Sequence, residues 1–342
     1  MKKLEGLKEF LSTPRKIVIT THSRPDADAL GSSLGLMLFL KKCHHDAVVI
    51  TPTDYPDFLK WMKGNDEVVV YNADRKNRCL ELIYDAELIF SLDYSSLKRI
   101  DDLGEPVGNS KADKILIDHH LEPENFAKYV LWSKQAAATA ELIYEFIREI
   151  GDINYIDKDI AECLYAGINT DTGSFRHPNV TKNIFEVSAE LVSKGADTAK
   201  VAKLIYDTNS EDRLRLLGYA LSENLKVLPE LNTAYFALSE TLLKKYNAQQ
   251  GDTEGLVNYA LSIEGIKLAA LFKESDGVVK MSFRSVGEFS VNEFAKEHFN
   301  GGGHKNAAGG ISEMTLNETV SKFEKLIKEE QSSITNNKSL VK

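Results

Sequence analysis

The first 130 residues alternate between short apolar runs and a segment with helical spacing. Apolar runs rich in Val and Ile occupy 16–20, 47–51, 67–71, 87–94 and 114–118. Residues 29–43 instead place apolar side chains three and four positions apart, as a buried helix does. Strands that alternate with helices predict a parallel sheet and therefore an α/β fold.

The pattern then becomes helical and afterwards returns to strands. Helical spacing dominates four segments, 136–151, 157–169, 181–195 and 211–225. From about residue 230 it predicts strands at 232–239, 266–274 and 278–285, helices at 257–265, 291–299 and 316–330, and a glycine-rich loop at 301–310. We expect an N-terminal parallel-sheet α/β domain over 1–190, a helical linker over 191–229, a smaller C-terminal α/β domain over 230–330 and a frayed polar tail over 331–342.

Composition narrows the class of protein. The chain has 342 residues and a formal net charge of −9, which argues against a broad basic surface that grips long nucleic acid. No apolar run reaches the ~18 to 20 residues of a membrane span, and the first 14 residues read as an amphipathic helix. Cys43, Cys79 and Cys163 are predicted to be reduced core thiols, and the pair His44–His45 to be at the surface. These features favour the cytoplasm.

Ligand-type side chains gather where the predicted strands end. His22, Asp26 and Asp28 follow the first strand, and Asp93 lies near the end of the run at 87–94. Asp118 ends the run at 114–118, and His119 and His120 follow it. In parallel α/β sheets, ligands sit beyond the carboxyl ends of the strands. A further acid, Asp171, precedes Thr-Gly after a predicted helix.

Carboxylate oxygen and imidazole nitrogen suit Mn²⁺ or Mg²⁺, and the histidines favour Mn²⁺. Asp26 and Asp28 are two positions apart, so in an extended loop they can serve two different ions. Two divalent ions ~3.5 to 4 Å apart form a clamp for attack on a phosphoester. Each motif alone also has a plainer reading: Asp26 and Asp28 as a turn or helix cap, and Asp171 as a turn.

Taken together, these motifs resemble the DHH phosphoesterase family. The triplet at 118–120 and the segment DADALGS at 26–32 match its signature, and the segment at 301–309 resembles the glycine loop of the associated DHHA1 domain. The resemblance implies that His22, Asp26 and Asp93 bind one ion, and that Asp28, Asp93, His119 and Asp171 bind the other. It also implies that Asp118 orients its neighbours and that His120 contacts the scissile phosphate.

In the second domain the resemblance implies a site for the rest of the substrate. The candidates are Arg284, Ser285, Asn292, Gly302, Gly303 and His304, with backbone N–H groups of the glycines and charged side chains approaching phosphate. Arg284 also has a plainer reading as a solvent-exposed strand residue.

The two-domain layout is similar to family members that hydrolyse short oligoribonucleotides (nanoRNA) to mononucleotides and convert 3′-phosphoadenosine 5′-phosphate (pAp) to AMP. The implied cofactors are two divalent ions, Mn²⁺ before Mg²⁺ or Co²⁺. The expected partners are short RNA or mono- and dinucleotide phosphates, with no long duplex, no membrane and a possible homodimer. Two alternatives stay open: a phosphodiesterase acting on cyclic di-AMP or pApA, and a non-catalytic nucleotide-binding protein.

Overall fold

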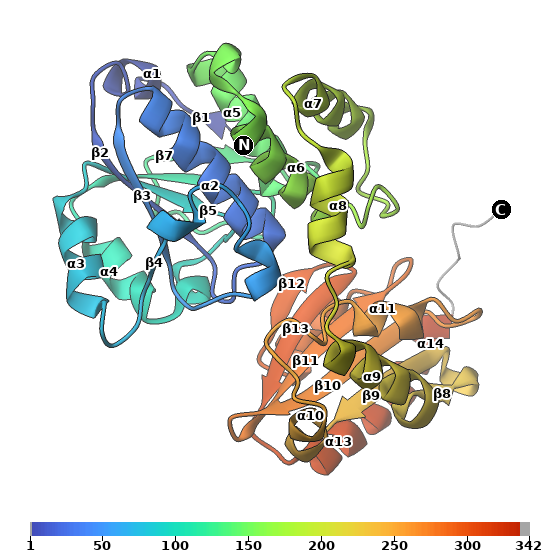
Figure 1. Ribbon diagram of the computed structural model, residues 1–342. Coiled ribbons are helices and arrows are strands. Elements are labelled where there is room, and N and C mark those ends of the chain that lie inside the picture. Colours follow the sequence, from blue (N-terminus) through green and yellow to red (C-terminus); the bar gives the residue numbers. More distant parts are fainter. Residues whose placement is uncertain (1, 336–342) are drawn as a thin grey trace. The chain divides into compact units, whose positions relative to one another are not determined.

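The chain divides into two compact units. The structure is a computed structural model and describes residues 2–335. The chain divides after residue 208 into unit 1 (1–208) and unit 2 (209–342) (Figure 1). This boundary falls inside the stretch 191–229 that we expected to be a linker. Helix α8 (Thr198–Tyr206) buries Val201 and Ile205 in the core of unit 1, whereas α9 (Glu211–Tyr219) belongs to unit 2. The expected linker is therefore divided between the two units.

Unit 1 is built on a sheet of seven strands in the order β1-β7-β6-β5-β2-β3-β4 among the described residues. Only β1 is antiparallel to its neighbour there; the other neighbouring strands are parallel, as expected. The strands are β1 (Lys2–Lys3), β2 (Lys16–Thr21), β3 (Asp46–Thr51), β4 (Val69–Val70), β5 (Leu88–Leu92), β6 (Asp113–Asp118) and β7 (Tyr129–Trp132).

The strand order creates a switch point between β2 and β5. From β2 the chain adds β3 and β4 on one side, then returns to add β5, β6 and β7 on the other. The crevice at such a point, beyond the carboxyl ends of the strands, is where open α/β sheets bind ligands. His22 follows β2 directly and Asp93 follows β5 directly, so topology alone places both at this crevice.

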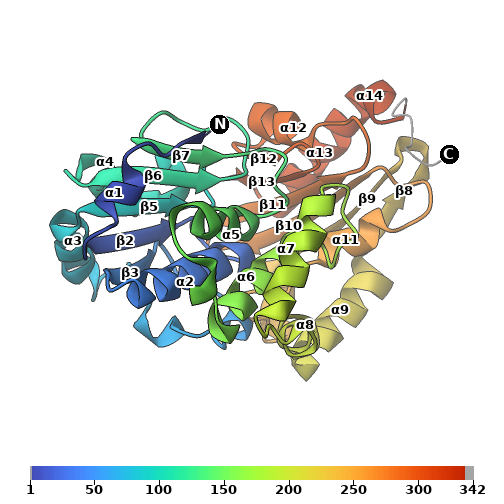
Figure 2. The same cartoon turned by 90° about the horizontal axis from the view of Figure 1, so that it is seen from above.

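Helices cover both faces of this sheet (Figure 2). One face packs on α2 (Ala27–Lys42), α5 (Thr139–Ile150) and α6 (Lys158–Asp171), and α7 (Lys182–Ser193) extends that core; the other face packs on α3 (Lys76–Asp85) and α4 (Gly104–Asn109). Alternate residues of β2 point to opposite faces: Ile17 and Ile19 join the first core and Val18 joins the second. Burial on both faces explains the nearly continuous apolar strand sequences.

Helices α2 and α6 cross at very short range. A Cβ added at Gly31 of α2 would lie 2.3 Å from the carbonyl oxygen of Cys163 in α6. Only glycine permits this approach. The close crossing brings the first turn of α2, which carries Asp28, beside the end of α6, which carries Asp171.

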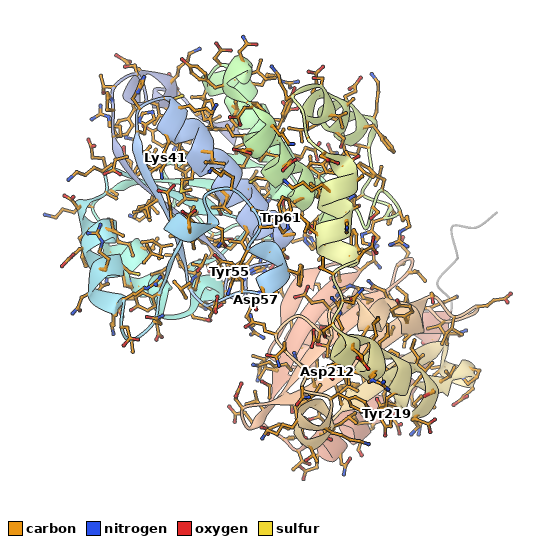
Figure 3. All side chains as sticks on the ribbon, in the orientation of Figure 1. Lys41, Tyr55, Asp57, Trp61, Asp212 and Tyr219 are labelled. Atoms are coloured by element: carbon orange, nitrogen blue, oxygen red, sulfur yellow. The ribbon has the colours of Figure 1, made fainter. Side chains whose placement is uncertain are left out.

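Unit 2 is a mixed sheet of six strands in the order β12-β13-β11-β10-β9-β8 within the described residues. The strands are β8 (Lys226–Leu228), β9 (Thr233–Leu238), β10 (Leu268–Ser275), β11 (Val278–Ser285), β12 (Gly302–His304) and β13 (Ala307–Ser312). One face packs on α12 (Val291–His298), α13 (Leu316–Glu329) and α14 (Gln331–Thr335), and the other on α11 (Leu256–Leu261). Helix α10 (Glu240–Lys245) lies near β10. The ring centroids of Tyr219, which ends α9, and Tyr246 are 5.6 Å apart; Tyr219 is labelled in Figure 3.

Several expectations need correction. The first 14 residues do not form one helix: Gly6 has a left-handed backbone and separates β1 from the short α1 (Leu7–Phe10). The segment 301–310 is a β-hairpin, β12 and β13, and not a loop. His45 is buried, and its Nδ1 accepts the N–H of Arg15.

The expected polar tail and the cysteines also differ in part. Residues 331–335 form α14, whose Ile334 is fully buried in the unit 2 core, and 336–342 lie outside the described residues. All three cysteines are free; Cys79 and Cys163 are buried, but Cys43 is half-buried. Between residues 2 and 335, no helix is both long and apolar enough to cross a membrane.

Candidate active site

Asp93 lies at the centre of a cluster of acids and histidines in unit 1. It directly follows β5, adopts a left-handed backbone with φ 63°, and is 2% exposed. Its Oδ2 lies 3.3 Å from Nε2 of His22, and its Oδ1 lies 3.4 Å from Nε2 of His119. A non-glycine residue in this backbone region is strained, and such residues gather at functional sites. The two oxygens of one carboxylate thus face two different histidines.

The group on the Oδ2 side consists of His22, Asp26 and Asp93. Asp26 is the N-cap of α2: its Oδ1 accepts the N–H groups of Asp28 and Ala29, each at 3.0 Å. Its Oδ2 faces His22 Nε2 at 3.8 Å. One ligand atom from each of the three residues lies within 4.8 Å of the others. The plainer reading of Asp26 as a helix cap is therefore correct for one oxygen only.

Asp28 is held by the first turn of a different helix. It is fully buried, and its Oδ2 and Oδ1 accept the N–H groups of Thr139 (2.6 Å) and Ala140 (2.9 Å) at the start of α5. A Cβ at Gly167 of α6 would lie 2.5 Å from Asp28 Oδ1, so only glycine leaves room for this carboxylate. Our expectation of an extended loop at 26–28 is wrong, because both acids begin α2.

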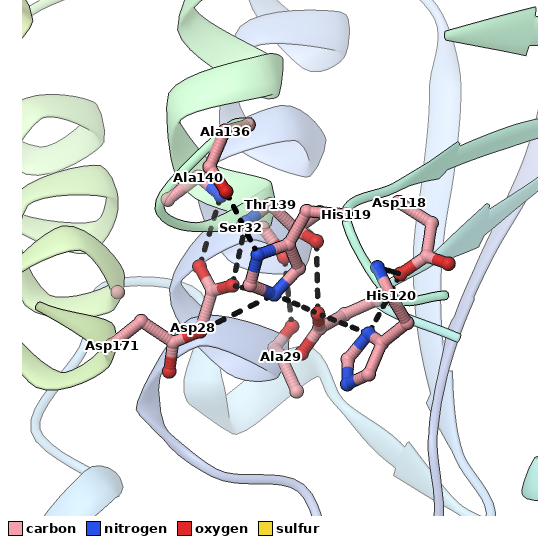
Figure 4. Close-up of polar contacts among 12 residues, drawn as sticks. Asp28, Ala29, Ser32, Asp118, His119, His120, Ala136, Thr139, Ala140 and Asp171 are labelled. Atoms are coloured by element: carbon pink, nitrogen blue, oxygen red, sulfur yellow. Dashed lines mark hydrogen bonds and ion pairs between the residues drawn. The ribbon is translucent and has the colours of Figure 1, made fainter. Parts of the chain in front are cut away.

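The group on the Oδ1 side contains Asp28, His119 and Asp171 (Figure 4). His119 Nε2 lies 3.3 Å from Asp171 Oδ2 and 3.9 Å from Asp28 Oδ2, and the three side chains point toward one another. Its other ring nitrogen, Nδ1, is 3.3 Å from the carbonyl oxygen of Ala136. Asp171 ends α6 and is the most exposed member of this group, at 25% of its side chain.

Asp118 holds the ring of His120 in place. Asp118, the last residue of β6, accepts at Oδ1 both the ring Nδ1 of His120 (2.8 Å) and its backbone N–H (3.1 Å). The indole N–H of Trp132 donates to the carbonyl oxygen of His120 at 2.6 Å. A carboxylate on Nδ1 fixes that nitrogen as the protonated one and turns Nε2 away from Asp118.

The electrostatics of these groups show how strongly they interact. Burial raises the pKa of Asp28 well above its usual value, and the carboxylates of Asp93 and Asp171 raise it further. Burial also lowers the pKa of His119, but Asp171 and Asp93 outweigh it and hold that pKa well above normal. For Asp93, hydrogen bonds from His119 and His22 outweigh burial and bring its pKa well below normal. The directions of these pKa shifts are those of imidazoles that oppose the negative charge of the buried carboxylates.

The donor set fits divalent cations. Carboxylate oxygens and imidazole nitrogens converge in two groups, one with His22, Asp26 and Asp93 and one with Asp28, His119 and Asp171, and no thiolate is among them. Asp93 belongs to the first group and also lies 3.4 Å from His119 of the second. A divalent ion would take over the balancing role of the imidazole protons, because a metal-bound imidazole is neutral. The carboxylates of Asp28 and Asp93, less than 3% exposed, would then be compensated without protonation.

In unit 2 the predicted binding residues share one end of the β11–β13–β12 sheet. Arg284 pairs with Ala307, which pairs in turn with His304, so Arg284 and His304 occupy one cross-strand row. The side chains of Ser285 and Asn292 are buried and engaged within the unit: Ser285 Oγ donates to the carbonyl oxygen of Phe289.

Asn292 helps to hold the hairpin in place. Its Oδ1 accepts the backbone N–H of Gly303 at 2.8 Å. Gly303 has φ 154°, and a Cβ there would lie 2.5 Å from the carbonyl oxygen of Ala307. Gly302 pairs with Gly309 across the same hairpin. The N–H of Gly303, which we expected to approach a phosphate, is therefore used by the fold.

Comparison with known proteins identifies the family. The model of the DHH family N-terminal domain matches residues 16–168, and the DHHA1 domain model matches residues 232–333. A Streptococcus mutans protein named probable bifunctional oligoribonuclease and PAP phosphatase NrnA is 31% identical over 86% of this chain and 89% of its own. The chain belongs to the DHH family and carries a DHHA1 domain.

Two further proteins are similar to this DHH-family chain. A crystal structure of an exopolyphosphatase-related protein from Bacteroides fragilis superimposes with a TM-score of 0.91, 39% identity and 97% coverage of both chains. The cyclic-di-AMP phosphodiesterase PdeA of Listeria monocytogenes is 28% identical over 92% of this chain, which spans 47% of that protein. Family membership makes the chain a DHH phosphoesterase; which ester it cleaves is a narrower question.

Sequence reasoning missed several residues around the DHH site. Thr139 and Ala140 hold Asp28, the hydroxyl of Thr139 also donates to Asp93 Oδ1 at 2.8 Å, and Trp132 holds His120. A signal for the first pair was present in the sequence. Helix α5 begins after Ala138, which has no side chain able to cap it, so its first N–H groups need an acceptor from elsewhere.

Proposed function

We propose that this protein is a two-metal phosphoesterase that hydrolyses short oligoribonucleotides to mononucleotides and dephosphorylates pAp to AMP. The observation that carries the two-ion part is the carboxylate of Asp93, whose two oxygens face two separate ligand groups. The substrate class is supported by the similarity, along most of both chains, to the S. mutans protein whose name states these two activities.

In this proposal each ligand group holds one divalent ion, Mn²⁺ in preference to Mg²⁺ or Co²⁺. His22, Asp26 and Asp93 would hold the first, and Asp28, His119, Asp171 and the other oxygen of Asp93 would hold the second. Two bound ions supply an activated water and offset the charge of the phosphoryl oxygens. Neither task then requires a nucleophilic side chain from the protein.

His120 is proposed to act on the leaving group. The hydrogen bond from Nδ1 to Asp118 holds the ring in one orientation and so fixes the direction of Nε2. From that position Nε2–H can donate to a phosphoryl oxygen and pass its proton to the leaving ribose oxygen. Asp118 acts through His120, since it is fully buried.

For the DHHA1 domain we propose that Arg284 and His304 bind substrate charge. They flank Ala307 in one cross-strand row, and directly paired residues project from the same face of a sheet. The small side chain of Ala307 leaves space between the two, so an anionic group can contact both. Ser285, Asn292, Gly302 and Gly303 would contribute by shaping the hairpin that carries His304.

A substrate panel tests the proposal. The wild-type protein with Mn²⁺ would be given pAp, RNAs of two to five nucleotides, pApA, cyclic di-AMP and pyrophosphate, and kcat/KM would be compared. We expect the highest values for dinucleotide RNA and pAp, and loss of activity when EDTA removes the metal. Preference for pyrophosphate, or no hydrolysis of any ester, would reject the proposed substrate class.

A second candidate is hydrolysis of cyclic di-AMP or pApA. It is favoured by the similarity of nearly the whole chain to PdeA. In the same panel, a kcat/KM for cyclic di-AMP above that for linear RNA would select this candidate. The third reading, a non-catalytic nucleotide-binding protein, predicts no hydrolysis of bis-p-nitrophenyl phosphate with any divalent metal.

A further inference from the structure

Thr139 contacts two of the clustered carboxylates at once. Its hydroxyl donates to Asp93 Oδ1 at 2.8 Å, and its backbone N–H donates to Asp28 Oδ2 at 2.6 Å. The residue is fully buried, and Figure 4 shows it in the same cluster as Asp28 and His119. Hydrogen bonds to ionised acceptors are about twice as strong as neutral ones, so both contacts constrain the carboxylates.

The start of α5 explains why Thr139 faces the site. Ala138 occupies the N-cap position with an extended backbone and offers no side-chain acceptor. Asp28, 111 residues earlier in the chain, accepts the first two helical N–H groups instead. The helix start is thereby fixed against Asp28, and the side chain of its first residue is brought within reach of Asp93.

The hydroxyl also limits what Asp93 can do. A carboxylate oxygen has two lone-pair directions, and Thr139 takes one of those of Oδ1. Oδ2 lies toward His22, on the other side of the carboxylate. The rotation of the carboxylate is therefore constrained at both oxygens, and each oxygen is left to face a different ligand group. The strained backbone of Asp93 would not by itself determine this rotation, because the side-chain torsions are separate from φ.

We infer that Thr139 is a positioning residue that holds Asp93 in its bridging orientation, and that the paired binding of two divalent ions depends on its hydroxyl. The inference rests on the proposed two-ion function. Groups that orient metal ligands commonly change metal affinity 10–100-fold when they are removed. The threonine would act through Asp93 and Asp28, without contact with the substrate.

The test compares Thr139→Val with Thr139→Ser. Valine keeps the shape and the backbone N–H to Asp28 but removes the hydroxyl; serine keeps the hydroxyl. Electron paramagnetic resonance during Mn²⁺ titration would report isolated ions and the exchange-coupled signal of a bridged pair. We expect a coupled signal in the wild type and in the serine variant. The valine variant should bind one ion roughly 10–100-fold more weakly and show little coupled signal at wild-type saturation.

Thr20→Val is the matched control. Thr20 is also fully buried, but its hydroxyl contacts the carbonyl oxygen of Phe90 and the hydroxyl of Tyr94, and neither atom is a candidate metal ligand. The exchange-coupled signal of the Thr20→Val variant should equal that of the wild type. If Thr139→Val does not fold, Thr139→Ala carries the same expectation with a smaller side chain.

The outcomes separate the inference from the proposed function. A coupled pair in the wild type and an equal pair in Thr139→Val would overturn the role of Thr139 and leave the two-ion proposal intact. Loss of the pair in both the valine and serine variants would also overturn it, because the hydroxyl would not be the deciding group. Absence of a coupled pair from the wild type would overturn both.

Discussion

Unit 1 and unit 2 both carry polar residues at strand ends, but they use them differently. In unit 1 the side chains of Asp28, Asp93 and His119 are buried and directed at one another, so acids converge on acids. In unit 2 the buried polar residues Ser285 and Asn292 are engaged with backbone groups of their own fold. The first arrangement fits a divalent cation; in the second, the polar groups are bonded within the fold.

The difference shows how polar residues of a functional site can be distinguished from polar residues that only support the fold. Buried polar groups are normally satisfied by partners within the protein, and Asn292 with Gly303 follows that rule. Asp28 and Asp93 also have hydrogen-bond partners, but they are carboxylates buried close together, and their pKa values move in opposite directions. Strongly shifted pKa values of this kind are frequent at functional sites.

The strongest test of the comparison is removal of Asp93. Asp93→Ala deletes the carboxylate shared by both ligand groups, and we expect kcat/KM on dinucleotide RNA to fall about a thousandfold, or about 4 kcal/mol. Asp93→Asn should show a similar loss, since asparagine tolerates the left-handed backbone but is a poorer metal ligand. Steady-state kinetics with Mn²⁺ would measure both.

Asp113→Ala is the control for this prediction. Asp113 begins β6, at the opposite end of the strand from Asp118, and forms an exposed ion pair with Lys128. Its loss should leave the kinetics unchanged. Retention of more than a tenth of wild-type activity in Asp93→Ala would show that the carboxylate does not bridge the ions.

Metal binding should stabilise unit 1 selectively. An ion at 100 times its dissociation constant contributes about 2.7 kcal/mol, which for a domain of this size raises Tm by roughly 5–10 °C. Hydrogen exchange with and without Mn²⁺ would locate the effect: we expect slower exchange at the start of α5, where Asp28 accepts N–H groups, and no change in β11. Equal protection of both units, or none, would contradict the assignment of the ions to unit 1.

Much of the unit 1 site was predictable because strand ends are easy to locate. The apolar runs that end before His22, Asp93 and Asp118 are β2, β5 and β6, and their carboxyl ends meet at the switch point. The role of Thr139 was not predictable in the same way. It depends on contact between residues 111 positions apart, and no local pattern encodes the pairing of α5 with Asp28.

For the glycine-rich segment, the local sequence pattern predicted the wrong structure. Glycines are depleted in strands, so the run at 301–310 indicates a loop. Pairing of β13 with β11 overrides that preference and makes a hairpin. The prediction for His45 was wrong for a related reason: the residue is buried and accepts the N–H of Arg15, 30 residues away, which an adjacent pair of histidines does not reveal.

Arg284 tests whether unit 2 also binds substrate. Arg284→Ala should raise KM for dinucleotide RNA about 10- to 100-fold and leave kcat nearly constant, because the loss of one charge-assisted contact costs about 1.5–3 kcal/mol. Arg215→Ala is the matched control, since Arg215 is exposed and pairs with Glu211 of the same helix. A fall in kcat at constant KM would reject a binding role for Arg284.

Asn292 gives the smallest effect and distinguishes scaffolding from binding. Asn292→Ala leaves the N–H of Gly303 without its acceptor, so the free energy of unfolding should fall by about 1–3 kcal/mol. Asn292→Asp keeps an oxygen acceptor and should recover most of that loss, although it adds a negative charge. Denaturant unfolding would measure the stabilities, and KM for dinucleotide RNA would be followed in parallel. If the alanine variant keeps wild-type stability while its KM rises, Asn292 contacts the substrate directly. A buried polar residue of unit 2 would then serve binding, as the buried acids of unit 1 are proposed to do, and not only the fold.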